Sequence, residues 1–283
     1  MNVVVLEDGL ADRSSGRQPG RTSTRSRTMP TRTDPPAVAG ARPPADLEIA
    51  IPAYNEASRL PQTLQRTAQF LQDQPWSSRV VVVDNGSCDE TADIARAIAG
   101  TTDGSVPIDV MGCARPGKGA VVRRALLTSR SRYVGFFDAD LATPVETLAA
   151  AMTHLTRGAP AVIASRRIPG ASTVRAQPPA RRLGGAAFRL LTRSMVKGIH
   201  DTQCGFKFFN REAVTHALVA CRSTGFAFDV ELLRHLQRSG HHIMEIPVAW
   251  SDASASTFHP LRDGLPSFGA VLQMRRKTPG WPV

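Results

Sequence analysis

Two aspartates one residue apart form the strongest chemical signal in the sequence. Asp138 and Asp140 come at the end of an apolar segment, Tyr133–Asp138, that predicts a buried strand. Unpaired carboxylates are costly to bury, so their position predicts a compensating cation. Mg²⁺ and Mn²⁺ prefer such oxygen ligands and also bind substrate phosphates. The pair predicts a metal-dependent site for a phosphorylated ligand, although the same spacing by itself is common in ordinary turns.

Other polar residues follow predicted strands in the same way. Asp84 ends a β-branched segment and precedes an Asn-Gly turn, a geometry that suits hydrogen bonding to a base or a ribose. Glu56 follows the apolar segment Leu47–Ala53. Lys118 lies in the cationic loop Arg115–Gly119 before a predicted helix, where the helix dipole and the ammonium group together favour phosphate.

Strands and helices that alternate along the chain must position these side chains. The predicted strands are Leu47–Ala53, Val80–Asp84, Ile108–Gly112, Tyr133–Asp138, Ala161–Ser165, Gly205–Phe209 and Ile243–Trp250. The predicted helices are Pro61–Gln72, Glu90–Ala99, Ala120–Arg130, one ending at Thr156, Asn210–Ala220 and Phe228–Ser239, with capping boxes at Ser87–Glu90 and Thr143–Glu146. This order predicts an α/β fold with a mixed, mainly parallel sheet and helices on both faces. Ligands bind such sheets at the carboxyl ends of the strands, which is where the polar residues lie.

Composition limits the classes to which the protein can belong. Its 283 residues are 42% hydrophobic, enough for one sizeable core, and no stretch reaches the roughly 18 apolar residues of a spanning helix. The four cysteines lack metal-ligand spacing and the N-terminus lacks a secretion signal, so a cytoplasmic protein is expected. The formal charge of +11 predicts an anionic partner. Without aromatic interleaving or a nucleic-acid module, we expect no nucleic-acid binding.

Eight blocks, taken in order, resemble the family 2 glycosyltransferases, whose fold is the GT-A nucleotide-diphospho-sugar transferase fold. The blocks are IPAYNE (51–56), VVVDNGSCDET (81–91), RPGKGAVVR (115–123), DADLATP (138–144), ASRR (164–167), DTQCGFKFF (201–209), FAFDVELL (226–233) and EIPVAW (245–250). So many blocks in register are far more specific than any one of them. Within the family, the sequence is most similar to the polyprenyl-phosphate sugar transferases, the dolichyl-phosphate β-glucosyltransferase and mannosyltransferase group.

The resemblance implies roles for particular residues of this sequence. Nucleotide-sugar binding is implied for Pro52, Tyr54, Glu56, Asp84, Lys118, Asp138 and Asp140, and binding of Mg²⁺ or Mn²⁺ for Asp138 and Asp140. Catalytic positions are implied for Asp140, Arg166, Arg167, Gln203 and Asp229, with Glu231 beside Asp229. Pro52 and Tyr54 could equally shape a turn. We expect Asp201 to hydrogen-bond loop backbone, Phe206, Phe208 and Phe209 to lie in the core, and Cys204 to be buried without a nucleophilic role.

Two positions depart from the family pattern. Ala142 stands where mannosyl members have a Gln that can help to bind the metal, so weaker metal binding or a water in that place is expected. Ser254–Phe258 lacks the Lys of the Gly-Ser-Lys-like segment of glucosyl members, which puts one phosphate contact in doubt.

The resemblance implies an inverting transfer of a hexose, with glucose from UDP-glucose as the expected donor, onto a polyprenyl phosphate. That acceptor is already an anionic nucleophile, so positioning it and neutralising the departing diphosphate suffice without a general base. Displacement on an α-linked donor then gives a β-linked product. Two alternatives stay open. A soluble hydroxyl acceptor would need a base, with Asp229 or Glu231 as candidates, and a nucleotide-sugar-binding protein would have no turnover.

The chain divides into a basic tail at residues 1–45 that is predicted to be disordered, a GT-A domain at 46–250, and an amphipathic, basic segment at 251–283. The helix predicted near Arg182–Lys197 is also basic and amphipathic. Both segments predict attachment to the inner face of the plasma membrane, or else packed helices with a solvated cationic face. The sequence leaves the oligomeric state open.

Overall fold

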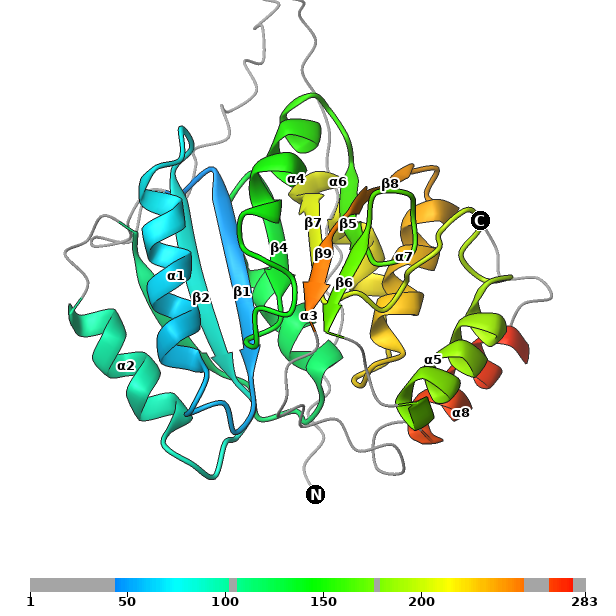
Figure 1. The fold of residues 1–283 in the computed structure, drawn as a ribbon, viewed down its shortest axis with the longest axis horizontal. Helices are drawn as coiled ribbons and strands as arrows, with labels where there is room; N and C mark the ends of the chain where they lie inside the picture. Colours follow the sequence, from blue (N-terminus) through cyan, green and yellow to red (C-terminus); the bar gives the residue numbers. More distant parts are fainter. Residues whose placement is uncertain (1–43, 102–105, 176–178, 252–264, 277–283) are drawn as a thin grey trace, which may run out of the picture. The chain divides into compact units, whose positions relative to one another are not determined.

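The structure, a computed structural model, describes residues 44–101, 106–175, 179–251 and 265–276. The tail predicted at residues 1–45 lies outside the described residues except for its last two positions, and Ser254–Phe258 lies outside them entirely. The elements in chain order are β1 (Leu47–Ala53), α1 (Leu60–Gln72), β2 (Ser78–Asp84), α2 (Thr91–Thr101), β3 (Ile108–Gly112), α3 (Lys118–Thr128), β4 (Tyr133–Phe137), α4 (Thr147–Thr156), β5 (Ala161–Ser165), β6 (Ser172–Arg175), α5 (Pro179–Thr192), β7 (Phe206–Asn210), α6 (Arg211–Ala220), α7 (Phe228–Arg238), β8 (Ile243–Pro247), β9 (Ala249–Ser251) and α8 (Leu265–Arg276) (Figure 1).

A seven-stranded sheet organises these elements, in the order β3-β2-β1-β4-β7-β5-β8. The strands β1 to β4 run parallel, with Ala53 of β1 opposite Asp84 of β2. β7 is antiparallel to both of its neighbours, β4 and β5, while β5 is parallel to β8. The expected mixed, mainly parallel sheet is confirmed, and β1, β2 and β4 end at the same edge.

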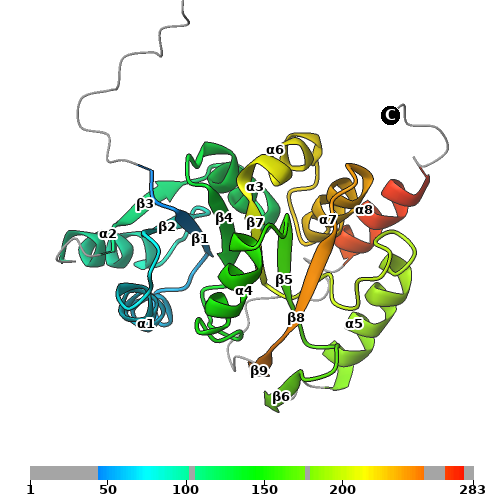
Figure 2. The same ribbon diagram turned by 90° about the horizontal axis from the view of Figure 1, so that it is seen from above.

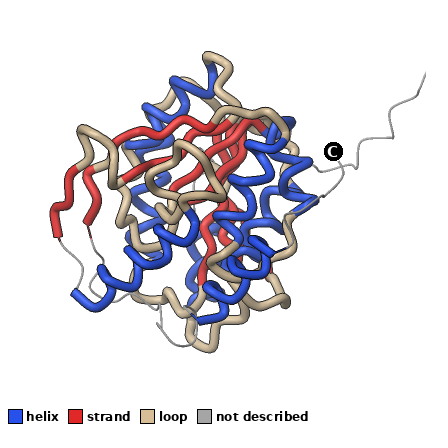
Figure 3. Tube along the Cα trace, turned by 90° about the vertical axis from the view of Figure 1, so that its right-hand side faces the viewer, coloured by secondary structure: helices blue, strands red, loops and turns tan. Residues whose placement is uncertain are grey.

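Helices cover both faces of this sheet, as expected (Figure 2, Figure 3). Successive residues of a strand point to opposite faces, so the side chains divide between two cores. One core joins the sheet to α1, α2 and α4, and includes Ile49 and Leu64. The other joins the opposite face to α3, α6 and α7, and includes Ala50 and Val122. A sheet that is buried on both faces requires the continuous apolar strands found in the sequence.

Both predicted capping boxes are wrong. α2 begins at Thr91, whose N–H donates to the Asp89 carboxylate at 3.0 Å. The Ser87 hydroxyl, expected to cap this helix, accepts from the Asn55 N–H at 3.0 Å instead. The Thr143 hydroxyl contacts a cysteine thiol before β7, and α4 begins four residues later without a side-chain cap. Long-range contacts around the candidate site therefore use the side chains that the local pattern had assigned to helix ends.

The single strand predicted over Ile243–Trp250 is two strands. β8 stays in the main sheet, whereas β9 pairs with β6 in a separate two-stranded parallel sheet. The break comes after Pro247, which has no N–H to donate, so the ladder of this edge strand ends there.

The helices α5 and α8 lie side by side (Figure 1, Figure 2). The rings of Phe188 and Phe268 meet edge to face with 5.2 Å between their centres, and Val271 of α8 is fully buried. The Arg234 side chain of α7 donates to the Met274 carbonyl at 3.1 Å, so α8 packs on the body of the domain. Within the described residues, no helix has the length and apolar character needed to cross a bilayer.

Gly135 marks the tightest approach of β4 to β7. A Cβ at this position would collide with the Phe208 ring and the Lys207 carbonyl. Gly135→Ala should therefore lower the free energy of unfolding by about 1–3 kcal/mol, because overpacking forces neighbouring side chains out of their rotamers. Gly100→Ala is the control, since a Cβ there meets nothing within 4 Å and Ala is the better helix former. Urea unfolding measures both, and a wild-type midpoint for Gly135→Ala would contradict this packing.

Candidate active site

The carboxyl ends of three neighbouring strands bring the predicted polar residues to one edge of the sheet. β1 lies between β2 and β4, so the loops that follow these strands are adjacent. The Asn55 N–H after β1 donates to the Ser87 hydroxyl after β2, and Thr63 of α1 donates to the Ala139 carbonyl after β4 at 2.6 Å. The Glu56 carboxylate is close enough to the aspartates after β4 for their charges to affect it.

Asp138 and Asp140 lie in a tight turn after β4. The Asp138 N–H donates to the Gly205 carbonyl, and the Asp140 carboxylate accepts from the Ala142 N–H, each at 3.0 Å. Leu141 has a φ of 49°, in the left-handed region that a residue with a bulky side chain rarely adopts. A Cβ on Gly205 would collide with the Asp138 carboxylate, so this approach requires glycine. The turn thus fixes both carboxylates.

The charges at this turn suit a bound cation. Burial and the neighbouring Asp138 raise the pKa of Asp140. Burial also raises the pKa of Glu56, against the opposing effect of Arg59, whose guanidinium lies 2.6 Å from it. The chain therefore does not fully compensate these carboxylates in their ionised form.

The donor atoms fit a magnesium or manganese ion. Within the described ranges, no group of three His, Cys, Asp or Glu side chains is placed to hold a metal. Mg²⁺ and Mn²⁺ do not need such a group, because one or two carboxylates suffice when water and substrate phosphates supply the other ligands. Asp138 and Asp140 supply this kind of incomplete, oxygen-only set.

Lys118 forms an ion pair with Asp138. It is the first residue of α3, and Gly117 before it has a φ of 110°. A Cβ on Gly117 would collide with the Thr224 carbonyl, so both the conformation and the space require glycine. Burial alone would lower the pKa of Lys118, but Asp138 and two further aspartates outweigh it and raise that pKa. The charged ammonium group thus lies at the N-terminus of a helix, an arrangement that favours phosphate.

The residues predicted to hold the nucleoside lie at the ends of β1 and β2. Pro52 is half-buried, and Tyr54 is 39% exposed. The Asp84 carboxylate accepts from the Gly86 and Ser87 N–H groups at 3.1 and 3.3 Å, so it also shapes the turn that follows β2.

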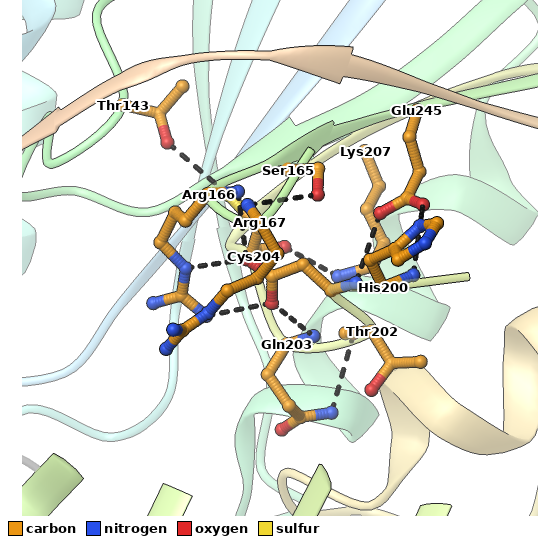
Figure 4. Close-up of polar contacts among 11 residues, drawn as sticks. Thr143, Ser165, Arg166, Arg167, His200, Thr202, Gln203, Cys204, Lys207 and Glu245 are labelled. Carbon is orange, nitrogen blue, oxygen red and sulfur yellow. Dashed lines mark hydrogen bonds and ion pairs between the residues drawn. The ribbon is translucent and has the colours of Figure 1, made fainter. Parts of the chain in front are cut away.

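The fully buried Asp201 fixes Arg166, which is one of the residues labelled in Figure 4. The Arg166 guanidinium donates to both oxygens of Asp201, at 2.6 and 2.9 Å, and its backbone N–H donates to the same carboxylate at 3.1 Å. Burial alone would raise the pKa of Asp201, but Arg166 outweighs it and lowers that pKa. The expected bonds of Asp201 to loop backbone are present, at Arg166 and at the Gln203 N–H, but its main partner is the guanidinium. The direction of Arg166 is therefore fixed.

Arg167 and Gln203 belong to the same region (Figure 4). Arg167 is exposed, and the Gln203 side-chain amide donates to the Thr202 carbonyl at 3.4 Å. On α5, burial lowers the pKa of Arg189, and so do the charges of Arg167 and Arg166. Three guanidinium groups thus lie near one another, which favours an anion.

Asp229, predicted to be catalytic, lies below the surface of the site. Its carboxylate is 4% exposed and lies 2.7 Å from the Nζ atom of Lys207, which is fully buried. The neighbouring Glu231 is engaged as well, since it accepts from the Arg222 and Ser223 N–H groups at 3.0 and 2.7 Å. The catalytic role of Asp229 stays a prediction, and its burial favours an indirect one.

The apolar residues around Lys207 behave as expected. Phe206, Phe208 and Phe209 are fully buried. Cys204 is buried too, and burial raises the pKa of its thiol to about 11. A thiol with that pKa is a poor nucleophile at neutral pH.

Sequence reasoning missed Lys207 and Asn85. A lysine inside an apolar strand was itself a signal, because a buried ammonium group needs a partner. The Asn85 amide donates to the Cys113 and Arg115 carbonyls at 3.0 and 2.9 Å and accepts from the Gly117 N–H at 2.8 Å. The Asn-Gly pair indicated a turn, but nothing local indicated that Asn85 holds a loop some thirty positions away.

The Arg166–Asp201 pair should stabilise the fold as a unit. Arg166→Met leaves a buried carboxylate without its partner and should lower the free energy of unfolding by about 3–5 kcal/mol. Arg166→Met/Asp201→Asn removes both charges and should recover most of that loss. Urea unfolding at pH 7 tests this, and a double variant as unstable as the single one would contradict the pairing.

The Arg166–Asp201 pair should also make the free energy of unfolding depend on pH. Arg166 outweighs burial and lowers the pKa of Asp201 in the folded protein, so the stabilisation is complete above the ordinary carboxyl pKa of about 3.9. It should then be lost as the pH falls through the lower, folded-state pKa. Unfolding of the wild type and of the double variant between pH 7 and pH 3 measures this, and a stability difference that does not change with pH would contradict it.

The chain is similar to known proteins in sequence. Residues 48–217 match the model of glycosyl transferase family 2. The chain is 32% identical to dolichyl-phosphate beta-glucosyltransferase of Homo sapiens over 231 residues, which cover 77% of this chain and 71% of that protein. It is 29% identical to the protein of the same name from Dictyostelium discoideum over 243 residues, 81% of this chain and 73% of that one.

Solved structures share the fold. Glucosyl-3-phosphoglycerate synthase from Mycobacterium tuberculosis in complex with uridine-diphosphate has a TM-score of 0.61 at 19% identity, over 83% of this chain and 82% of that one. The same synthase is also known in complexes with Mg²⁺ or Mn²⁺ and uridine-diphosphate. The fold is therefore the GT-A fold. The chain belongs to glycosyl transferase family 2, in the hexosyltransferase group that contains the dolichyl-phosphate β-glucosyltransferases.

Proposed function

We propose that the protein transfers glucose from UDP-glucose to a polyprenyl phosphate at the cytoplasmic face of the membrane, with inversion at the anomeric carbon. The observation that carries this proposal is the similarity to dolichyl-phosphate beta-glucosyltransferases over 81% and 77% of the chain. The site supports it with a carboxylate pair and an ammonium group suited to a diphosphate, and with clustered guanidinium groups suited to a second phosphate.

The donor half of the site lies at the ends of β1, β2 and β4. Asp138 and Asp140 would hold Mg²⁺ or Mn²⁺, which when bound neutralises charge on the diphosphate. Lys118 adds a positive charge at the N-terminus of α3. Tyr54 and Asp84, with Pro52 and Glu56, would contact the nucleoside and the sugar.

The acceptor half needs no proton transfer. A phosphate oxygen attacks the anomeric carbon, the new carbon–oxygen bond forms, and the bond to the diphosphate breaks, so that the electron pair leaves with UDP. Arg166 and Arg167, with Gln203, would orient the acceptor phosphate for this displacement. The phosphate is already anionic, so the burial of Asp229 and the engagement of Glu231 are no obstacle to the reaction.

The membrane surface would meet the face formed by α5 and α8. Leu190 on α5 is 76% exposed, and Leu272 on α8 is 46% exposed. Arg193, Lys197 and Arg275, which are also exposed, give the same two-helix region a positive charge. Apolar side chains flanked by cations suit the interface of a bilayer that contains anionic lipids.

Transfer to lipid is tested with purified protein, polyprenyl phosphate in detergent, Mn²⁺ or Mg²⁺, and radiolabelled UDP-glucose or GDP-mannose in parallel. The expected result is label from UDP-glucose in a lipid that mild acid hydrolyses, with a β-linked product. Asp140→Ala should reduce this label by at least about 100-fold, since the cation that would neutralise the diphosphate loses a carboxylate ligand. Asp109→Ala, the same change at an exposed strand residue, should leave the label unchanged.

Each other outcome of this assay has a consequence. Label from GDP-mannose would show that GDP-mannose and not UDP-glucose is the donor. An α-linked product would contradict transfer with inversion. Turnover with soluble acceptors alone would show that the acceptor is a soluble molecule and not polyprenyl phosphate. Metal-dependent UDP binding without any product would instead indicate a nucleotide-sugar-binding protein.

Membrane attachment is tested by sedimentation with vesicles of phosphatidylcholine and phosphatidylglycerol. Leu190→Glu/Leu272→Glu should reduce the bound fraction at least about fivefold, because it places two anions on the face that meets anionic lipid. Val219→Glu, on α6, is the matched control, since Val219 is also exposed, at 62%. Equal binding of the two variants would exclude the α5–α8 face as the attachment surface.

A further inference from the structure

Four charges of alternating sign run from the donor site into the core. Lys118 is paired with Asp138, and Lys207 is paired with Asp229 at 2.7 Å. The two ammonium groups also share an aromatic neighbour, because each Nζ atom lies 5.5 Å from the centre of the Phe136 ring. Both ion pairs therefore lie against the Phe136 side chain of β4, just before the turn with Asp138 and Asp140 that would hold the metal.

Backbone packing brings the two pairs together. A Cβ on Gly119, next to Lys118, would collide with the Phe228 side chain, next to Asp229. The Ala120 N–H also donates to the Thr224 carbonyl at 3.1 Å, so the start of α3 is bound to the loop before α7. Burial opposes the charged form of Lys118, but Asp138, Asp229 and Asp140 together outweigh burial and raise the pKa of Lys118.

The Lys207–Asp229 pair is shielded from solvent. Lys207 is fully buried, Asp229 is 4% exposed, and the Lys207 Nζ atom also donates to the Cys204 carbonyl at 2.6 Å. The positive charge of Lys207 cancels part of the negative potential that Asp229 produces at Lys118. Lys207 therefore limits how strongly Asp229 attracts Lys118.

We infer that Asp229 and Lys207 are positioning residues, which set how firmly Lys118 holds Asp138 and thereby how readily Asp138 accepts a divalent cation. A cation at Asp138 competes with Lys118 for the same oxygens. Asp229 makes this exchange easier, because it keeps a negative charge beside the displaced ammonium group. The inference rests on the donor half of the proposed function and is independent of the acceptor.

The test measures the affinity of the full chain for Mn²⁺ alone, from the electron paramagnetic resonance signal of the free ion. The pair is removed by Lys207→Met/Asp229→Asn, which leaves no unpaired buried charge and changes side-chain volume little. With Asp229 gone, Lys118 is held by Asp138 alone, so Mn²⁺ affinity should fall about fivefold. Lys118→Met should raise the affinity, since the competing ammonium is removed.

The same double substitution made in the Lys118→Met protein decides the mechanism. If the Lys207–Asp229 pair acts through Lys118, removing the pair from the Lys118→Met protein should change Mn²⁺ affinity by less than about twofold. An equal loss of affinity with and without Lys118 would overturn the inference, as would an unchanged affinity in the first double variant. If that variant fails to fold, Lys118→Met still decides, because an affinity that does not rise would exclude competition at Asp138.

A matched control removes an ion pair far from the site. Asp93 and Arg96 of α2 are exposed and lie 2.7 Å apart, so Asp93→Asn/Arg96→Met should leave Mn²⁺ affinity unchanged. Absence of Mn²⁺ binding in every protein would overturn the inference together with the metal site. Absence of lipid product with the expected Mn²⁺ pattern would instead refute the proposed transfer to lipid and leave this inference standing.

Discussion

The hydrogen bond from the Asp138 N–H to the Gly205 carbonyl joins the two halves of the site. It exists because β7 enters the sheet antiparallel, between β4 and β5. The chain therefore enters β7 at the edge of the sheet where β4 and β5 end. This places the Arg166–Asp201 pair near Asp138. Without this reversed strand, the residues suited to the donor and those suited to the acceptor would have no common loop.

The glycines at this junction follow from the same constraint. Gly205 leaves room for the Asp138 carboxylate, and Gly135 leaves room for the Phe208 ring one strand away. Gly117 and Gly119 do the same where α3 meets the loop before α7 and the start of that helix. At Gly205 the backbone thus comes close to a charged side chain, and at the other three glycines it comes close to an aromatic side chain or to another backbone segment. A side chain larger than hydrogen at any of these four positions would force the neighbouring segments apart.

Much of the fold could be predicted from the sequence, because each buried strand is a continuous apolar segment and helices separate most of the strands. The mixed sheet and the position of the site at its edge followed from that order. The two capping boxes and the single strand over Ile243–Trp250 were wrong for a common reason. Local patterns describe neighbours along the chain, whereas Ser87, Thr143 and β9 make their bonds to distant segments.

The site likewise contains features that could be predicted from the sequence and features that could not. Asp138, Asp140 and Lys118 were identifiable because carboxylates at a strand end and a lysine at a helix start have evident chemistry. The partnership of Arg166 with Asp201 and of Asp229 with Lys207 could not be seen, since each joins blocks that are separate in the sequence. Polar residues that are far apart in the sequence are thus partners in the folded protein.

This pairing also bears on the kind of acceptor. Among the residues that the structure describes, the two candidate bases are already bound, Asp229 by an ammonium and Glu231 by two backbone N–H groups, and the nearby Asp201 is bound by a guanidinium. Arg166 lowers the pKa of Asp201, so this carboxylate accepts a proton poorly, while Asp229 and Glu231 are engaged by groups of the protein itself. A hydroxyl acceptor would need one of these groups to be freed, at the cost of leaving its partner buried and unpaired. An acceptor that arrives as a phosphate needs no such rearrangement, because it brings its own negative charge to guanidinium groups already in place.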